Sequence, residues 1–269
     1  CIAKMYKVDE ICINLELLCQ YTNTKFIEEE GITIEPQKNQ IILKNGVTID
    51  YDYLLMNIGS QTKVNFDLED SPSIIYTRPI SQLITRLETL EENLIKGNHI
   101  PKIAIVGSGA AGIELCFGIK ERWNKCTNLD VDISLISNKK DILSERGTQT
   151  MKKVEKALKE KGIRVILDAN VDKIKSHKLS YTQGESKREI EFDFVVLATG
   201  ASCSNLFRNS GIETDDLGFM LVDDYLQCPK YPNILGAGDC VSIIKHYKEN
   251  FPPKAGVYAV REAPFMKNN

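Results

Sequence analysis

The sequence predicts an α/β fold with two Rossmann-like dinucleotide-binding units, each with a parallel sheet and a β-meander. Three observations support this fold class: a stretch that occurs twice, a glycine-rich turn between an apolar strand and a helix, and a Gly-Ala-Gly-Asp segment after a later strand. The length of 269 residues and the hydrophobic content of 42% suit one large or two modest globular domains.

The repeated stretch covers residues 41–60 and 179–201, and an aspartate precedes its closing glycine by seven residues in both copies, since 59 − 52 and 200 − 193 both equal seven. Each copy indicates a hairpin that leads into a buried strand of a parallel sheet. We expect the closing glycines, Gly59 and Gly200, to let a ligand approach the backbone at the carboxyl end of the strand. Two unrelated strands with ordinary turns are the alternative.

The glycine-rich turn follows the apolar strand 102–106 and has the G-x-G-x-x-G spacing of dinucleotide-binding proteins. A helix is expected after it, to about Trp123. Gly107 would form the tight turn, Gly109 would admit a pyrophosphate, and Gly112 would allow close helix-to-strand packing. The start of the helix would offer N–H donors to phosphates. The residues predicted to bind the nucleotide here are Gly107, Ser108, Gly109, Ala110 and Gly112; plain helix–sheet packing is the alternative.

The next strand, residues 131–136, lacks the acidic residue that would bind a free ribose 2′-hydroxyl at its end. Ser137 and Lys139 stand there instead, and we expect both to contact the nucleotide. A hydroxyl and two lysines suit a 2′-phosphate, which favours NADPH, or would leave the protein indifferent to the two nucleotides. The alternative is that both lysines are solvated loop charges.

Two amphipathic helices complete the predicted unit. The first is expected over Pro79 to Lys96 and the second over Thr148 to Lys161, where Gly162 ends it before a strand at 164–167. The unit then closes at Gly200. The first copy of the repeat has the same ending but no glycine-rich beginning, so we expect the sequence to be a fragment.

A third segment follows the second copy. Ile234 and Leu235 indicate a short strand, and Asp239 after it is suited to accept hydrogen bonds from sugar or ribityl hydroxyls, although a turn aspartate is the alternative. Residues 252–261 indicate the start of a helix whose small residues would let its N-terminus approach a planar ligand.

Together these motifs resemble the two-dinucleotide-domain FAD/NAD(P) oxidoreductases, the superfamily of pyridine nucleotide-disulfide oxidoreductases, type II NADH dehydrogenases and apoptosis-inducing factor. The segments that carry the resemblance are 107–112 with Glu114, Ala198-Thr199-Gly200, and 236–239 followed by a helix. Within the superfamily, residues 13–60 and 253–261 are most similar to the oxidoreductase module found beside, or fused to, selenophosphate synthetase (selenide, water dikinase). The resemblance covers essentially the whole chain.

The resemblance implies two cofactors, FAD and NAD(P)H. It places an FAD-binding domain at residues 1–78 and 201–269, with the first βαβ unit missing, and an NAD(P)-binding domain inserted at 79–200. Glu114 matches a glutamate near the flavin N5 and the nicotinamide; a helix-surface glutamate is the alternative. The residues implied to contact FAD are Gly59, Gly238, Asp239, Ala255 and Gly256.

Such a protein would pass hydride from NAD(P)H to FAD and then to an acceptor, with no protein nucleophile. No two cysteines have C-x-x-C or C-x4-C spacing, so we expect a quinone or another small acceptor rather than a thiol relay. The rival hypothesis is a non-catalytic nucleotide-binding module that regulates an attached selenophosphate synthetase.

Composition argues against other classes of function. The net charge of −3 and the lack of a dense basic tract disfavour nucleic acid as a partner. No stretch approaches the roughly 18 to 20 consecutive apolar residues of a membrane span. The three histidines, one of them His99, are not at ligand spacing from cysteines or carboxylates, so no metal site is predicted. Eight scattered cysteines favour a reducing intracellular compartment, whose identity stays open.

Overall fold

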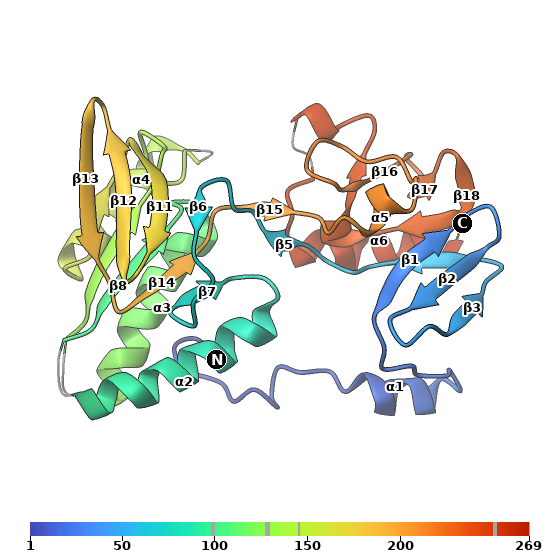
Figure 1. Ribbon diagram of the computed structural model, residues 1–269, viewed down its shortest axis with the longest axis horizontal. Helices are drawn as coiled ribbons and strands as arrows, with labels where there is room; N and C mark the ends of the chain where they lie inside the picture. The colour runs from blue at the N-terminus through green and yellow to red at the C-terminus, as the bar shows by residue number, and fades with distance from the viewer. Residues whose placement is uncertain (98–99, 127–129, 145, 250–251, 269) are drawn as a thin grey trace. The chain divides into compact units, whose positions relative to one another are not determined.

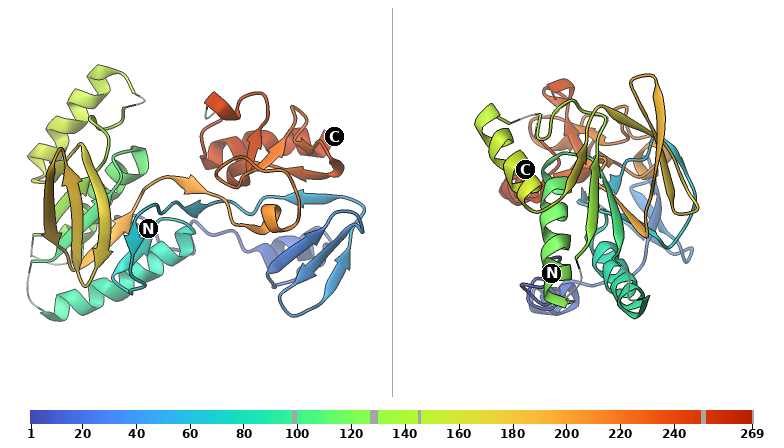
Figure 2. Two further views of the ribbon diagram at one scale, coloured as in Figure 1. Left: turned by 45° about the horizontal axis from the view of Figure 1, so that its top comes forward. Right: turned by 90° about the vertical axis from the view of Figure 1, so that its left-hand side faces the viewer.

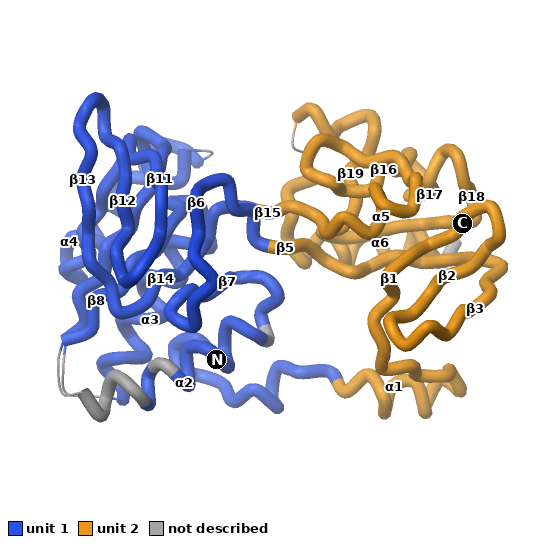
Figure 3. Tube along the Cα trace, viewed as in Figure 1, with its two compact units in different colours: residues 1–13, 62–200 blue, residues 14–61, 201–269 orange. Residues whose placement is uncertain are grey.

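The computed structural model of the chain (Figures 1 and 2) describes residues 1–97, 100–126, 130–144, 146–249 and 252–268. The chain divides into two compact units, which Figure 3 shows in different colours. Unit 1 comprises residues 1–13 and 62–200, and unit 2 comprises residues 14–61 and 201–269. The larger segment of unit 1, residues 62–200, therefore lies between the two segments of unit 2 in the sequence.

Unit 1 is built on a five-stranded sheet in which every neighbouring pair is parallel. The strand order is β10 (Arg164–Ile166), β9 (Asp132–Ile136), β8 (Lys102–Val106), β14 (Phe194–Leu197) and β7 (Ile74–Tyr76). The helices are α2 (Ile80–Gly97), α3 (Ala110–Cys126) and α4 (Thr148–Glu160). These bounds agree with the predicted strands and helices to within a few residues.

A second sheet of unit 1 contains the predicted meander. Strands β11 (Ala169–Lys175), β12 (Lys178–Gln183) and β13 (Ser186–Glu191) pair antiparallel, and β6 (Asp67–Leu68) pairs parallel with β11. The hairpin β12–β13 leads directly into β14, which confirms the hairpin-and-strand interpretation of the second repeat copy.

Alternate residues of the parallel strands contribute to two separate hydrophobic clusters. Ile103 and Ile105 of β8 pack with helix residues such as Ile119, whereas Ala104 and Val106 pack with meander residues such as Leu179. Both faces of the strand are thus covered, which explains its continuous apolar run. Helices and meander lie on opposite sides of the parallel sheet (Figure 2).

Unit 2 contains smaller sheets. Its first half holds α1 (Leu15–Tyr21), β1 (Gly31–Glu35), β2 (Gln40–Leu43), β3 (Thr48–Asp50), β4 (Leu54–Met56) and, at its end, β5 (Gln61–Thr62). Its second half holds β15 (Ala201–Ser202), α5 (Leu206–Asn209), β16 (Met220–Val222), β17 (Gln227–Cys228), β18 (Tyr231–Gly236), the 3-10 helix η1 (Gly238–Cys240), β19 (Val241–Ile243), η2 (Tyr247–Glu249) and α6 (Gly256–Asn268).

The two halves of unit 2 are joined by strand pairing and by a common core. Strand β4 pairs parallel with β18, whose other neighbour is the antiparallel β17, and a hydrophobic cluster joins Met56 to Ile234 and Phe219. The first repeat copy is also a hairpin, β2–β3, followed by a strand, β4. That strand is less buried than its counterpart, since Leu55 is 57% exposed.

The domain boundaries differ from those predicted. Residues 62–78, assigned from sequence to the FAD-binding domain, belong to unit 1 by contact, and so do residues 1–13. The reason for the first difference is strand pairing: β7 extends the parallel sheet beside β14, and β6 extends the meander beside β11.

Among the described residues, none of the helices combines the length and the apolar character needed to cross a membrane.

Candidate functional site

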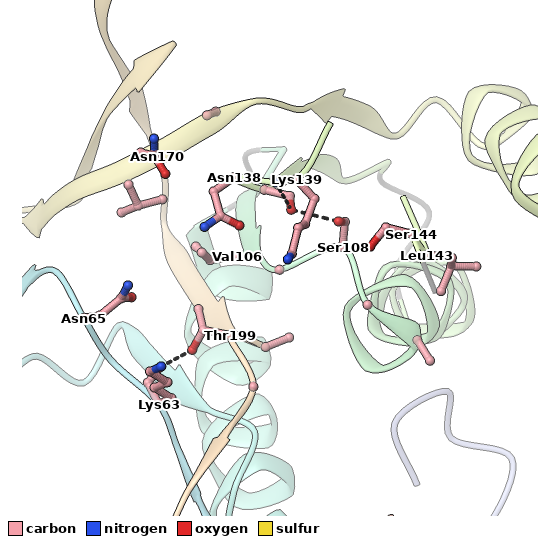
Figure 4. A pocket seen from close by; sticks show the side chains of 18 of the residues that line it. Lys63, Asn65, Val106, Ser108, Asn138, Lys139, Leu143, Ser144, Asn170 and Thr199 are labelled. Carbon is pink, nitrogen blue, oxygen red and sulfur yellow. Dashed lines mark hydrogen bonds between the residues drawn. The ribbon is translucent and has the colours of Figure 1, made fainter. Parts of the chain in front are cut away.

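A cavity of about 480 Å³ lies in unit 1 at the carboxyl ends of β8, β9 and β14 (Figure 4). Its volume is in the range of small-molecule sites, and its position is where open α/β sheets bind ligands. The predicted residues that line it are Gly107, Ser108, Gly109, Ala110, Ser137, Lys139 and Gly200. The fold therefore brings together the glycine-rich turn, the end of the next strand and the closing glycine of the repeat.

The glycines of the turn fit the roles expected from their spacing. Gly107 has φ +116°, and a Cβ there would collide with the carbonyl oxygen of Ala198. A Cβ at Gly112 would collide with the carbonyl oxygen of Gly107, so this glycine lets α3 start close beneath the turn. Gly109 has open space where its Cβ would be, and it lines the cavity. The turn is thus closed toward the sheet and open toward a ligand.

Two buried serines hold the turn against the next strand. Ser108 and Ser137 are 3% and 4% exposed, and the Ser108 hydroxyl donates to Oγ of Ser137 at 2.8 Å. The backbone N–H of Lys139 donates to the same oxygen at 3.1 Å, and the N–H of Leu143 donates to the carbonyl of Ser108 at 3.0 Å. The side chain of Ser108 is therefore structural, and the surrounding turn provides the surface of the cavity.

The cavity is lined by positively charged side chains, although the chain as a whole is negatively charged. Its described lining contains the cations Lys63, Lys139 and Arg146 and no carboxylate, although the chain carries a net charge of −3. In Figure 4, Lys139 extends into the cavity between Asn138 and Ser108. Cations at the rim and an open glycine turn at the base are the features of a site for a phosphate-bearing ligand.

The opposite wall comes from the meander and from the segment after β14. Asn170 and Val171 belong to β11, and the hydroxyl of Thr199 donates to the carbonyl oxygen of Lys63, which holds the two lining segments together (Figure 4). Gly200 has φ +103° and open space at its Cβ position, so the backbone is accessible there.

Sequence reasoning missed several lining residues and proposed two, Glu114 and Gly112, that do not line the cavity. Lys63, Arg146 and Asn170 contribute to the cavity but follow no motif, because the folded chain brings them to the glycine turn from three separate segments. Glu114, predicted to act near the cofactors, is exposed on α3 and is not part of the lining. Gly112 acts by packing instead of by lining.

A second candidate site lies in unit 2, at the end of β18. Gly238 has φ +74°, and a Cβ there would lie 2.9 Å from Cβ of Ala259 on α6 and 3.2 Å from Oδ1 of Asn57. Oδ2 of the half-buried Asp239 accepts a hydrogen bond from the Ser60 hydroxyl at 3.2 Å. The Gly238-Asp239 turn thus lies beside the end of the first repeat copy, as two strands that share a sheet require.

Helix α6 starts at Gly256, as expected, and contributes a carboxylate to this turn. Oε2 of Glu262 accepts a hydrogen bond from the backbone N–H of Gly238 at 2.6 Å. Burial raises the pKa of Glu262, and the hydrogen bond from Gly238 partly offsets this effect. Ala255 and Gly256 are exposed at the start of the helix. Glu262 was not predicted, because no sequence motif marks it.

Lys254 anchors the segment that leads into α6. Its ammonium group donates to the carbonyl of Val241 and to Oγ of Ser242, the latter at 3.2 Å, and lies 4.1 Å from the centre of the Phe219 ring. Burial lowers the pKa of Lys254, against the opposing effect of nearby carboxylates such as that of Asp215. The start of α6 is therefore fixed by polar contacts with β19.

The eight cysteines all lie in the described residues and carry free thiols. Burial raises the pKa of both Cys116 and Cys203 to about 12, so neither is a reactive thiolate near neutral pH. His99 lies outside the described residues, and among the remainder no group of three or more His, Cys, Asp or Glu is arranged to hold a metal ion.

The parallel sheet, the glycine turn at its carboxyl edge and the cationic cavity above that turn define a dinucleotide-binding protein of the Rossmann class. The family profile described as "Pyridine nucleotide-disulphide oxidoreductase" matches residues 5–255. The chain therefore belongs to the pyridine nucleotide-disulphide oxidoreductase family.

Individual relatives are distant. An NADH oxidase of Methanocaldococcus jannaschii is 27% identical over 250 residues, which cover 90% of this chain and 53% of that protein. A type II NADH:quinone oxidoreductase of Haemophilus influenzae is 25% identical over 237 residues, covering 77% of this chain and 52% of the relative. The chain thus spans about half the length of these curated relatives.

A solved structure shows the same fold. The water-forming NADH oxidase from Lactobacillus brevis, bound to NADH, superposes with a TM-score of 0.79 at 19% sequence identity, covering 100% of this chain and 59% of that one. This likeness confirms the predicted α/β fold.

Proposed function

We propose that this chain is part of a flavin-dependent oxidoreductase that accepts hydride from NAD(P)H onto FAD and passes the electrons to a quinone or another small acceptor. The single observation that carries the proposal is the unit 1 cavity, in which an open glycine turn and three cations converge with no described carboxylate in the lining. Unit 1 would bind NAD(P)H, and unit 2 would contribute to binding FAD.

The residues of unit 1 fit a dinucleotide. The turn around Gly109 leaves room for a pyrophosphate, and the first N–H groups of α3 would donate to its oxygens. The positive charge of the cavity lining would attract the phosphates of the dinucleotide. Gly107 and Gly112 keep the turn close enough to the sheet for this geometry, because neither position has space for a side chain.

The residues of unit 2 fit the ribityl part of a flavin nucleotide. The carboxylate of Asp239 would accept hydrogen bonds from hydroxyls, while Ser60 holds that carboxylate in place. Gly59 has φ +68° with open space at its Cβ position, so backbone approach is possible beside Ser60. The exposed start of α6, at Ala255 and Gly256, would present its N–H groups to the electron-rich edge of the ring system.

Bound FAD would supply the two-electron redox chemistry of the reaction. The chain's own part is to bind both nucleotides and to orient their rings for direct transfer. The proposal gives Glu114 a role in handling a proton or charge near the reacting rings. Glu114 is exposed on α3 and does not line the unit 1 cavity. In this role it would therefore act on a group that lies outside the cavity.

The proposal of a quinone or other small acceptor is supported by a relative named as a quinone oxidoreductase and by the buried, high-pKa state of two cysteines in this chain. A thiol relay also needs two neighbouring cysteines, and no two cysteines of this chain have C-x-x-C or C-x4-C spacing.

The test is an anaerobic titration of the complete protein, purified and loaded with FAD, with NADPH and with NADH. We expect a yellow protein whose oxidised-flavin absorbance is lost after addition of one of the nucleotides and returns when a quinone analogue is added. The same protein with Gly109→Val is the matched control and should retain flavin but resist reduction. Retention of flavin without bleaching by either nucleotide would refute the proposed hydride transfer.

The alternative is a non-catalytic nucleotide-binding module that regulates selenophosphate synthetase. It is supported by the resemblance of residues 253–261 to modules associated with that enzyme. A complete protein that stays colourless after incubation with FAD, yet changes the activity of an added selenophosphate synthetase, would favour this alternative. A yellow protein bleached by NAD(P)H would exclude it.

A further inference from the structure

We propose that the unit 1 cavity selects NADPH over NADH, because Ser137, Lys139 and Arg146 form a site for the 2′-phosphate of the adenosine ribose. The inference rests on the proposed nucleotide site and adds to it the identity of the nucleotide. It also assigns a role to Arg146, which no sequence motif marks.

Directly after β9 stands a neutral hydroxyl, that of Ser137, where a carboxylate would select a free ribose hydroxyl. Oγ of Ser137 accepts hydrogen bonds from the Ser108 hydroxyl and from the Lys139 N–H, so its own hydroxyl hydrogen is left to donate. A carboxylate can only accept when ionised and would repel a phosphate, whereas this hydroxyl can donate to one. The cavity has no described carboxylate elsewhere that could replace it.

The backbone around Ser137 and Lys139 is fixed before any ligand binds. The carbonyl of Ser137 accepts from the N–H of Ala169 at 2.9 Å, and the carbonyl of Lys139 accepts from the N–H of Asp168 at 2.9 Å. These bonds attach the loop to the start of β11 from both sides of Asn138. Within residues 137–139, only the side chain of Lys139 must be ordered when it contacts an anion, which limits the entropic cost of binding.

Arg146 reaches the same cavity from the far end of the loop that joins β9 to α4. Its N–H donates to the carbonyl of Leu143 at 2.8 Å, and Leu143 in turn donates to the carbonyl of Ser108. The arginine is therefore connected through the backbone to the glycine turn itself. Its planar guanidinium can bind two phosphate oxygens at once, which the lysine cannot.

Both cations are available for a ligand. Within the described part of the chain, the structure records no ion pair for Lys139 or for Arg146, whereas many other lysines and arginines of unit 1 face a carboxylate, as Arg164 does with Asp132 at 3.0 Å. A 2′-phosphate carries a charge of about −1.5 to −2 near neutral pH and would be the missing counter-charge. NADH has only a hydroxyl at that position and would leave the two cations unmatched.

Adenosine 2′,5′-bisphosphate and 5′-AMP provide the sharpest test, because they differ only in the 2′-phosphate. We expect isothermal titration of the full chain to show at least about ten-fold tighter binding of the bisphosphate, the effect of one charge-assisted hydrogen bond. The difference should shrink at high ionic strength, because the rim of the cavity is exposed to solvent. NADPH and NADH should show the same order.

Three variants test the contributions of Arg146 and Ser137 to the affinity for the 2′-phosphate. Arg146→Met should weaken the bisphosphate by about ten-fold and leave 5′-AMP unchanged, because it removes one charged hydrogen-bond partner. Ser137→Asp should reverse the preference, since its carboxylate would accept from a ribose hydroxyl and repel the phosphate. Lys140→Met is the matched control: this exposed neighbour of Lys139 does not line the cavity, and its removal should change neither affinity.

The outcomes distinguish this inference from the proposed function. Equal binding of the two adenosine nucleotides, or an Arg146→Met variant that loses both equally, would overturn the 2′-phosphate site and leave the nucleotide site in place. If neither adenosine nucleotide binds and neither NADPH nor NADH binds, the nucleotide site itself is overturned. Thermal unfolding of each variant without ligand checks that an effect on affinity is not an effect on folding.

Discussion

Replacement of Glu91 by glutamine should strongly destabilise unit 1, because it removes the counter-charge of a buried arginine. Glu91 of α2 and Arg122 of α3 are 4% and 1% exposed, and their closest atoms, Oε2 and Nη2, lie 2.6 Å apart. Lys4 adds a second ion pair to the other carboxylate oxygen at 2.7 Å. In Glu91→Gln the guanidinium would stay buried without a negative partner.

The expected loss is about 3–5 kcal/mol in the free energy of unfolding, the usual cost of removing one partner of a buried ion pair. This is a large part of the roughly 5–15 kcal/mol that typically stabilises a folded protein. The double variant Glu91→Leu with Arg122→Met should be much closer to the wild type, since no buried charge is left unpaired. The exposed pair of Lys156 and Glu160 supplies the control, and Glu160→Gln should cost only about 0.3–0.5 kcal/mol.

Urea unfolding followed by tryptophan fluorescence measures these differences, because the chain has one tryptophan, Trp123, and it is buried beside Arg122 in α3. Burial alone would raise the pKa of Glu91, but hydrogen bonds from Cys126, Lys4 and Arg122 more than offset it, so the pKa is lowered from 4.5. The contribution of the pair is therefore present at neutral pH and lost as the pH falls below about 4.5. A Glu91→Gln variant no less stable than Glu160→Gln would refute the reasoning.

Three further outcomes test the sites and the thiols. Gly112→Ala should lower the free energy of unfolding by about 1–3 kcal/mol, because the added Cβ meets a backbone oxygen, and this cost outweighs the better helix propensity of alanine. Gly109→Ala should unfold like the wild type, because its Cβ meets open space, but should bind nucleotide more weakly in titration. Asp239→Asn in the complete protein should reduce the affinity for flavin about ten-fold or more, since a charged hydrogen-bond acceptor is lost. The flavin retained on gel filtration measures this affinity, and unchanged retention would contradict the assignment of Asp239 to the flavin site. Native protein treated with iodoacetamide near pH 8 should be alkylated at exposed Cys12 and not at Cys116, whose pKa burial raises to about 12; equal labelling by mass spectrometry would show that unit 1 opens readily.

Local patterns predicted the parts of the fold in which function is concentrated. The turn at Gly107 was predictable because only glycine fits a position with φ +116° beneath a neighbouring carbonyl. The run from Phe194 was predictable because a strand packed on both faces has no polar alternation. The repeat identified the position of Gly200 by its spacing alone.

Long-range pairing could not be predicted in the same way. Residues 74–76 became part of unit 1 because they pair with β14, far along the chain, and nothing in their own sequence specifies that partner. Arg146 and Glu262 were also missed: no motif includes either residue, and the fold brings each of them to a glycine turn. Their roles depend on tertiary geometry and not on spacing.

The register of the central strands determines the height of the glycine turn above the sheet. Val106 lies opposite Leu197, so the residues that follow each strand, Gly107 and Ala198, meet at one level. Deletion of a single residue from β8 would shift Gly107 by about 3.3 Å along the strand. It would also exchange the side chains of β8 that face the helices with those that face the meander. Added residues at the Gly184 hairpin, where the backbone turns in open space, would leave this alignment intact. Natural variation in length should therefore accumulate at the tip of the meander and be excluded from the strand that precedes the turn.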